Sequence, residues 1–226
     1  MRLADVHPRQ VRASIAALLA CSVAGCAHVA DRDDALGAAR VGKAHRQGVV
    51  SVANPYGAEA GAQVLELGGN AIDAAVAVAY ALNVVEPQSA GIGGGGFMMI
   101  HLAKTGQTFA IDSRETAPAG ATPAMFVGVP DASLQGVAVG VPGMVRGTAL
   151  ALERYGSLPL AAVLQPAIKL ADQGFAATPR YAAVSCNRRS QNSPEAAAIF
   201  CPGGASPVAG SRVNPTPAPE KPPPLP

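Results

Sequence analysis

Hydrophobic residues at the start of the ordered body of the chain predict a strand followed by a helix. The apolar run 49–52 is typical of a buried strand. Asn54 and Pro55 then form a favourable helix start, because an asparagine side chain caps free backbone N–H groups and proline loses no hydrogen bond at the first helical position. The glycine pair 68–69 predicts the end of this helix.

A second helix is predicted over residues 71–85. Asn70 is its N-cap, and Asp73 completes a capping box with aspartate in place of the usual glutamate or glutamine. The helix is apolar on nearly all sides, which indicates burial against several neighbours in a layered fold. It is too short to span a membrane, since a span needs about 20 apolar residues.

The patterns that follow predict a hairpin and two more helices. Strands are expected at 97–102 and 108–112 and helices at 144–155 and 160–173, with Pro166 expected to kink or split the last helix. The order of strand, two helices, hairpin and two helices predicts the α+β class, in a layered αββα arrangement with antiparallel strands.

The N-terminus predicts export. Three arginines precede the short apolar run 13–25, so residues 1–26 are interpreted as a signal peptide. The run ends in the letters VAGC, which resemble the lipobox of bacterial lipoproteins. We therefore expect lipidation at Cys26 and a location in the periplasm or the outer membrane. The alternatives are a weaker lipid site at Cys21 and ordinary cleavage without a lipid near Ala27 or Ala30.

Two segments are predicted to lack regular structure. Residues 27–47 are polar and mixed in charge, and they are expected to form a flexible spacer. Residues 201–226 are rich in proline, which cannot donate to a sheet ladder or continue a helix. This tail is therefore expected to be extended and disordered. A changed reading frame near Phe200 would produce such an ending.

Composition and charge exclude several functions. The net charge is +2 and no run of Lys or Arg occurs that would neutralise a phosphate backbone, so nucleic-acid binding is not expected. The four histidines are scattered without metal-ligand spacing, and no metal or other cofactor is expected. With the leader removed, Cys186 and Cys201 remain. An oxidising compartment would permit a disulfide, although their spacing does not decide between a bond and two free thiols.

The glycine-rich stretch 91–96 invites a phosphate-binding interpretation, which its context excludes. A Walker loop or a dinucleotide fingerprint follows a strand and opens a helix, whereas these glycines follow a helix and open a strand. The glycines therefore indicate either close approach of another backbone segment or a loop with positive φ.

Charged residues gather where the strand 108–112 ends. Asp112, Arg114 and Glu115 come together before Pro118, in a chain of which only 14% is charged. Taken alone, the cluster is typical of an ion pair at a strand end, which has small energetic value. A guanidinium at such a position can also hold a carboxylate by two parallel hydrogen bonds, as a lysine cannot.

Three stretches carry a resemblance to a known family. They are LELGGNAIDAAVAVAYALNVVEPQSAGIGGGGFMMI, AIDSRETAP and GVPGMVRGTALALERYG. In this order and spacing they resemble the front part of the large subunit of γ-glutamyltranspeptidases (glutathione hydrolases). The resemblance covers residues 48–200.

The resemblance implies part of an N-terminal-nucleophile hydrolase fold, an αββα sandwich that is incomplete in this chain. It implies transfer of a γ-glutamyl group from glutathione to water or an amino acid, by a threonine at the N-terminus of a separate small subunit and without a cofactor. The arginine of the SRE stretch, here Arg114, would bind the α-carboxylate of the γ-glutamyl donor. Asp112 would hold Arg114 in place, and Glu115 would point to the other side if the strand continued.

The sequence departs from the family in one respect that affects activity. The Thr-Thr-His type of motif that contains the nucleophile does not occur, so the chain alone is expected to be inactive. Two alternatives remain open. One is a truncated, non-catalytic envelope lipoprotein, and the other is a fragment of a related acylase that acts on glutaryl amides or poly-γ-glutamate.

Overall fold

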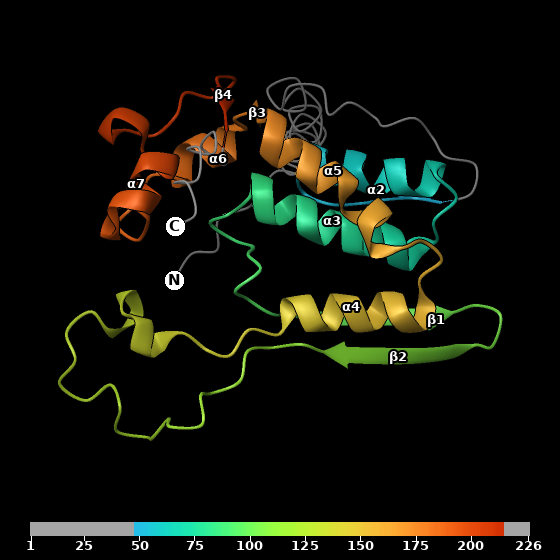
Figure 1. Cartoon of the computed structure of the whole chain (residues 1–226), viewed down its shortest axis with the longest axis horizontal. Helices are drawn as coiled ribbons and strands as arrows, with labels where there is room; N and C mark the ends of the chain where they lie inside the picture. Colours follow the sequence, from blue (N-terminus) through green and yellow to red (C-terminus); the bar gives the residue numbers. More distant parts are fainter. Residues whose placement is uncertain (1–47, 215–226) are drawn as a thin grey trace, which may run out of the picture. The chain divides into compact units, whose positions relative to one another are not determined.

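Asparagine caps start the first two helices in the described part of the chain. The computed structural model describes residues 48–214, which belong to one compact unit (Figure 1). Helix α2 (Pro55–Glu66) begins after Asn54, whose side chain accepts a hydrogen bond from the first turn. Helix α3 (Ala71–Val85) begins after Asn70 with the predicted capping box. Both predicted helices are confirmed.

Helix α3 is the centre of the helical layer and contacts α2, α4 (Met144–Tyr155) and α5 (Leu160–Gln173). Its N-terminal Asp73 is fully buried, and the carboxylate accepts hydrogen bonds from the backbone N–H groups of Asn70, Ser157 and Leu158. One side chain thus caps α3 and fixes the connection between α4 and α5.

Helix α5 continues through Pro166 as one helix, so of the kink or split expected at this proline the split does not occur. A proline inside a helix removes one backbone hydrogen bond. Pro166 itself is buried together with Val163 and Ala167 of the same helix face. No helix within residues 48–214 is long and apolar enough to cross a membrane.

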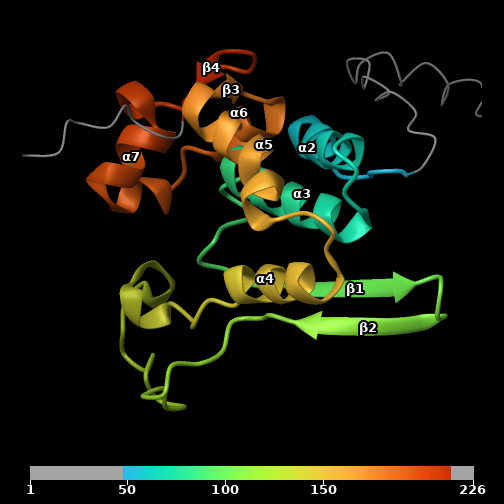
Figure 2. The same ribbon diagram turned by 45° about the vertical axis from the view of Figure 1, so that its right-hand side comes forward.

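Strands β1 (Phe97–Leu102) and β2 (Gln107–Asp112) form the predicted antiparallel hairpin. Helix α4 runs along one face of it (Figures 1 and 2). On that face Ile100 and Ile111 are buried, in a core that α2, α3, α4 and α5 complete with Val64, Ala74, Val76, Ala77, Ala151 and Val163. The other face is open, with Phe97 and Met99 each 70% exposed. The α+β class is confirmed.

The predicted strand at 49–52 does not form. The segment has no strand partner among residues 48–214, and Val49 is 91% exposed. A strand exists only where another strand supplies hydrogen-bond partners, which an apolar run cannot secure by itself. The apolar pattern was therefore insufficient for this assignment.

The proline-rich tail is more ordered than predicted. Strand β4 (Arg212–Val213) pairs with β3 (Phe175–Ala176), and Val213 is buried against Phe175 and Tyr181. The prediction of disorder from residue 201 is therefore wrong up to residue 214. The segment 208–214 contains no proline, so its backbone N–H groups are available for pairing. The predicted signal peptide 1–26 with Cys26, the predicted spacer 27–47 and residues 215–226 lie outside the described residues.

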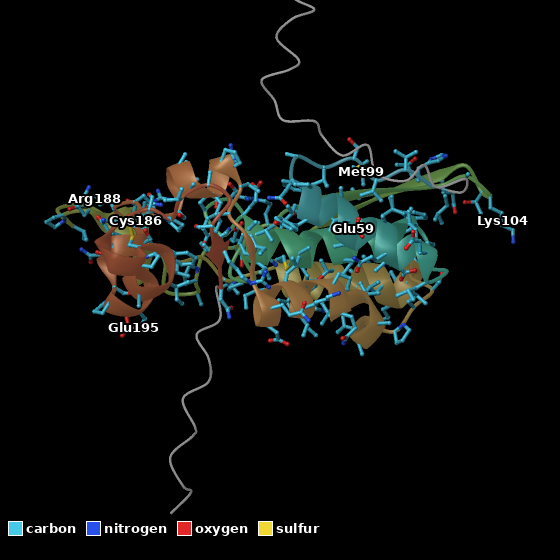
Figure 3. All side chains as sticks on the ribbon, turned by 90° about the horizontal axis from the view of Figure 1, so that it is seen from above. Glu59, Met99, Lys104, Cys186, Arg188 and Glu195 are labelled. Carbon is cyan, nitrogen blue, oxygen red and sulfur yellow. A yellow bond between two sulfur atoms is a disulfide. The ribbon has the colours of Figure 1, made fainter. Side chains whose placement is uncertain are left out.

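The two cysteines in the described part of the chain form a disulfide, which the sequence had left open. Cys186 and Cys201 are bonded, and their Cα atoms are 4.9 Å apart. The bond joins the chain after α6 (Pro179–Val184) to the end of α7 (Pro194–Phe200). Figure 3 shows Cys186 beside Arg188 in this part of the molecule.

Candidate functional site

Three backbone segments meet where strand β2 ends. Gly96 and Ser113 exchange backbone hydrogen bonds of 2.9 and 3.2 Å, and Ser113 Oγ also donates to the Gly96 carbonyl at 2.9 Å. On the other side, Thr116 and Val141 exchange backbone hydrogen bonds of 3.3 and 2.8 Å. The residues between Ser113 and Thr116 are therefore held between the glycine-rich loop and the segment that precedes α4.

The glycine-rich loop is also tied to the start of α4. The Gly94 carbonyl accepts hydrogen bonds from the backbone N–H groups of Gly143 at 3.1 Å and Met144 at 3.0 Å. These bonds satisfy donors that a helix N-terminus leaves free. The loop, the end of β2 and α4 thus form one connected frame.

Glycine is required in this frame because backbone atoms approach closely. A Cβ atom at Gly95 would lie 2.2 Å from the Ser113 carbonyl oxygen, and one at Gly143 would lie 2.1 Å from it. At Gly147, one helical turn after Gly143, a Cβ would lie 2.4 Å from the Ser113 Cβ. No glycine of the stretch 91–96 has a positive φ. Of the two predicted reasons for these glycines, close backbone approach is correct.

The Arg114 side chain pairs with Glu115. Arg114 Nη1 lies 3.2 Å from Glu115 Oε2, with 57% of the arginine side chain and 28% of the glutamate side chain exposed. Asp112 Oδ1 instead accepts a hydrogen bond from the Arg114 backbone N–H at 3.0 Å. Asp112 thus holds Arg114 through its backbone, and Glu115, which was expected to point away only if the strand continued, pairs with the guanidinium. Strand β2 ends at Asp112, so strand alternation no longer separates the side chains at 114 and 115.

A pocket of about 370 Å³ adjoins this ion pair. Arg114 and Glu115 form its polar side, and Met125, Phe126 and the segment 137–140 contribute most of its apolar side. A cation beside an apolar wall suits a small ligand with a carboxylate and an aliphatic chain. Within residues 48–214, no group of three His, Cys, Asp or Glu side chains could hold a metal ion.

Sequence reasoning missed the residues that build the frame. Ser113 was not singled out, nor were the glycines at 140, 143 and 147. A Cβ at Gly140 would lie 2.8 Å from the Glu115 Cβ, so this glycine makes room for the ion pair. The four-residue spacing of Gly143 and Gly147 was a usable signal, because it places two side-chain-free positions on one helix face.

Comparison with known proteins identifies the family. The sequence matches the family description Gamma-glutamyltranspeptidase over residues 57–218. It is 51% identical over 137 residues to the glutathione hydrolase proenzyme of Bacillus subtilis (strain 168), covering 58% of this chain and 23% of that relative. It is 42% identical over 181 residues to the acylase ACY 1 proenzyme of Pseudomonas sp. (strain SE83), covering 74% of this chain and 32% of that relative.

The fold is similar to a solved structure of the same kind. The crystal structure of Helicobacter pylori gamma-glutamyltranspeptidase superimposes with a TM-score of 0.71 at 40% identity, covering 76% of this chain and 52% of that chain. The predicted partial N-terminal-nucleophile hydrolase fold is thereby confirmed.

The family match continues to residue 218, beyond the end near Phe200 that the sequence motifs indicated. The chain spans about a quarter to a third of the length of the two curated relatives named above, at 23% and 32%. Within that span, the matched sequence and the shared fold show that the chain belongs to the gamma-glutamyltranspeptidase family.

Proposed function

We propose that the Arg114 pocket binds the γ-glutamyl donor of a γ-glutamyltransferase or glutathione hydrolase. In this proposal Arg114 holds the α-carboxylate, and a small subunit supplies the threonine nucleophile. Glutathione is the proposed donor, and water or an amino acid is the acceptor. The observation that supports this role is the position of the guanidinium, which lies at the edge of the pocket with 57% of its side chain exposed.

The ion pair with Glu115 supports a binding role for Arg114. A guanidinium carries five N–H donors in a planar fork, and Nη1 is the atom nearest to Glu115. The other donors have no hydrogen-bond partner in the described part of the chain, so they are available to a ligand carboxylate. Glu115 restrains the side chain before the ligand arrives, which lowers the entropy lost on binding.

Acylase activity is the second candidate, because the acylase relative matches 181 residues of this chain. A glutaryl group and a γ-glutamyl group each carry a carboxylate that Arg114 could hold. The γ-glutamyl group also has an α-ammonium, which the glutaryl group lacks. The two candidates therefore differ in a charge that a substrate comparison can detect.

The test uses three anilide substrates. The enzyme is this chain extended at its C-terminus with the remaining sequence of a family member, including the small subunit. The γ-glutamyl anilide carries the α-carboxylate and the α-ammonium, the glutaryl anilide carries only the carboxylate, and the 4-aminobutyryl anilide carries only the ammonium. The Arg114→Ala variant should lose most activity toward the γ-glutamyl substrate and little toward the 4-aminobutyryl one. An equal loss with both would contradict carboxylate binding by Arg114. Faster turnover of the glutaryl anilide would favour the acylase.

We also propose that the protein is exported and anchored through a lipid on Cys26, in the periplasm or the outer membrane. The arginines and the apolar run 13–25 support an export signal. The disulfide between Cys186 and Cys201 supports an oxidising compartment, since such bonds are rare where thiols are kept reduced.

A further inference from the structure

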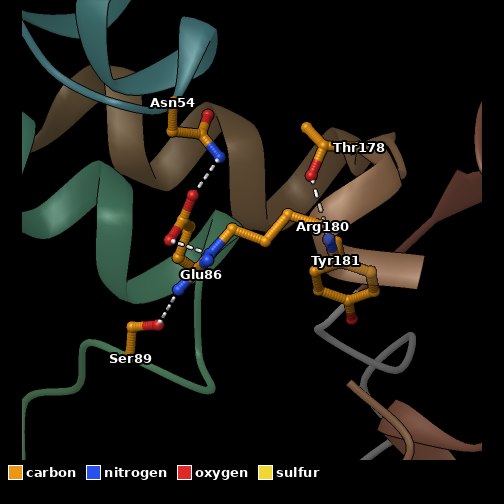
Figure 4. A network of polar contacts seen from close by, with 6 residues as sticks. All are labelled: Asn54, Glu86, Ser89, Thr178, Arg180 and Tyr181. Carbon is orange, nitrogen blue, oxygen red and sulfur yellow. Dashed lines mark hydrogen bonds and ion pairs between the residues drawn. The ribbon is translucent and has the colours of Figure 1, made fainter. Parts of the chain in front are cut away.

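A second arginine, remote from Arg114 in the sequence, is fixed by a buried carboxylate. Figure 4 shows Glu86 between Asn54 and Arg180: Asn54 Nδ2 donates to Glu86 Oε1 at 3.1 Å, and Arg180 Nε lies 3.4 Å from Glu86 Oε2. Arg180 Nη2 also donates to Ser89 Oγ at 3.4 Å. Two of the three guanidinium nitrogens are thus restrained, and Nη1 has no partner among residues 48–214. The side chain remains 63% exposed.

Arg180 lies on the wall of a cavity of about 930 Å³, which we call the α6–α7 cavity. Its lining includes Arg180, Arg188 and Arg189 and contains no aspartate or glutamate. Glu86 compensates the charge of Arg180, and Asp131 pairs with Arg188 at 2.5 Å. Arg189 makes no ion pair within the described residues. The cavity wall therefore carries one uncompensated positive charge.

Buried polar groups without partners also line the α6–α7 cavity. Both amide atoms of Gln88 and the hydroxyl of Ser185 are buried and make no hydrogen bond with any described residue, and Ser185 is only 3% exposed. Buried polar groups in proteins are nearly always hydrogen-bonded, because an unpaired one has lost its water without compensation. Both residues belong to the lining of the cavity, and the Gln88 amide nitrogen and the Ser185 hydroxyl are neutral donors without a partner in the described part of the chain.

The loop that carries Arg189 is restrained before any ligand binds. Asn187 Oδ1 accepts hydrogen bonds from the backbone N–H groups of Arg189 at 2.7 Å and Ser190 at 3.3 Å. The disulfide between Cys186 and Cys201 closes the loop from both ends. Such restraint reduces the entropy that ligand binding must overcome.

We propose that the α6–α7 cavity binds an oxyanion group, a carboxylate or a phosphate, of a small organic molecule. Arg189 supplies the charge, Arg180 presents its unpartnered Nη1, and Gln88 and Ser185 donate from the buried side. This site is separate from the Arg114 pocket and does not depend on the proposed γ-glutamyl function.

The test is isothermal titration calorimetry, which measures the affinity of the 226-residue chain for inorganic phosphate and for citrate. Sodium chloride keeps the ionic strength constant. We expect saturable binding with one site per chain for at least one probe. The Arg189→Ala variant should bind at least tenfold more weakly. Arg154→Ala is the matched control, because Arg154 is an exposed arginine of α4 outside the cavity and should bind as the parent does.

A second variant, Ser185→Ala, separates ligand binding from folding. It removes a buried hydroxyl that has no partner, so thermal stability without ligand should be unchanged or higher, while affinity for the probe falls severalfold. Binding of phosphate alone or citrate alone identifies the oxyanion. If neither probe binds saturably, the proposal is overturned. If Arg189→Ala and the parent bind the probe with equal affinity, the probe is an adventitious ion only, and the proposal is overturned as well.

Discussion

Arg114 and Glu115 form an ion pair with 3.2 Å between Nη1 and Oε2, although neighbours in a strand point to opposite faces. The pair exists because β2 ends at Asp112 and the chain turns within a frame of glycines. An exposed ion pair by itself contributes about 0–1 kcal/mol to stability. A larger effect of Arg114 on catalysis would therefore reflect ligand binding.

Replacing Arg114 with lysine should impair turnover of a γ-glutamyl anilide in the completed enzyme. Loss of one of two charge-assisted hydrogen bonds to the α-carboxylate costs roughly 1.5–3 kcal/mol. This corresponds to a decrease in kcat/KM of about tenfold to a hundredfold. The control is Arg146→Lys. Arg146 is exposed and lies 3.9 Å from the exposed Glu153, and neither residue lines the pocket. Equal kinetics for the two variants would contradict the role of Arg114.

Replacing Gly143 with alanine should destabilise the frame around Ser113. The φ angle of Gly143 is −115°, which alanine tolerates, so the penalty comes from the contact at 2.1 Å with the Ser113 carbonyl oxygen. Overpacking of this kind costs about 1–3 kcal/mol. The shift in the urea unfolding midpoint measures it. Gly120→Ala is the control, because a Cβ there has no atom within 4 Å. The close approach would be refuted by equal midpoints for the two variants.

Removing the disulfide should lower the free energy of unfolding. The bond closes a separation of 15 residues between Cys186 and Cys201, for which the chain-entropy estimate is about 3 kcal/mol. The measurement is urea unfolding of the Cys186→Ser, Cys201→Ser double variant beside the parent. Adding a reductant should destabilise the parent to the same extent and leave the double variant unchanged. A reductant without effect on the parent would show that the bond is absent in solution.

Replacing Cys26 with serine should release the protein from membranes or block its processing. Lipidation requires the thiol, and the mature protein should otherwise be found in the membrane fraction after cell lysis. Cys21→Ser is the matched control, and its fractionation should equal that of the parent. If Cys26→Ser and the parent fractionate identically, secretion without a lipid at Cys26 becomes the better interpretation.

Local signals in the sequence determined helices α2 to α5 and the hairpin, whereas helices α6 and α7 were not predicted. Asn54 and Asn70 cap helices whose turns depend on residues three or four positions away, and both boundaries are confirmed. The hairpin follows from two apolar runs joined by a short turn. The resemblance, carried by the motifs at 65–100, 110–118 and 140–156, led to the family. In each case the interacting residues are close in sequence or the motif is long.

Tertiary structure alone decided which distant segments meet. The run 49–52 has no strand partner among the described residues, whereas Val213 pairs with Phe175 across 38 positions of sequence. The contact between Gly143 and Ser113 likewise depends on the place where α4 begins above the end of β2. Pairing and close approach depend on both partners at once, and a local pattern describes only one of them. The pairing of Arg114 with Glu115, rather than with Asp112, was therefore not predictable from the strand pattern.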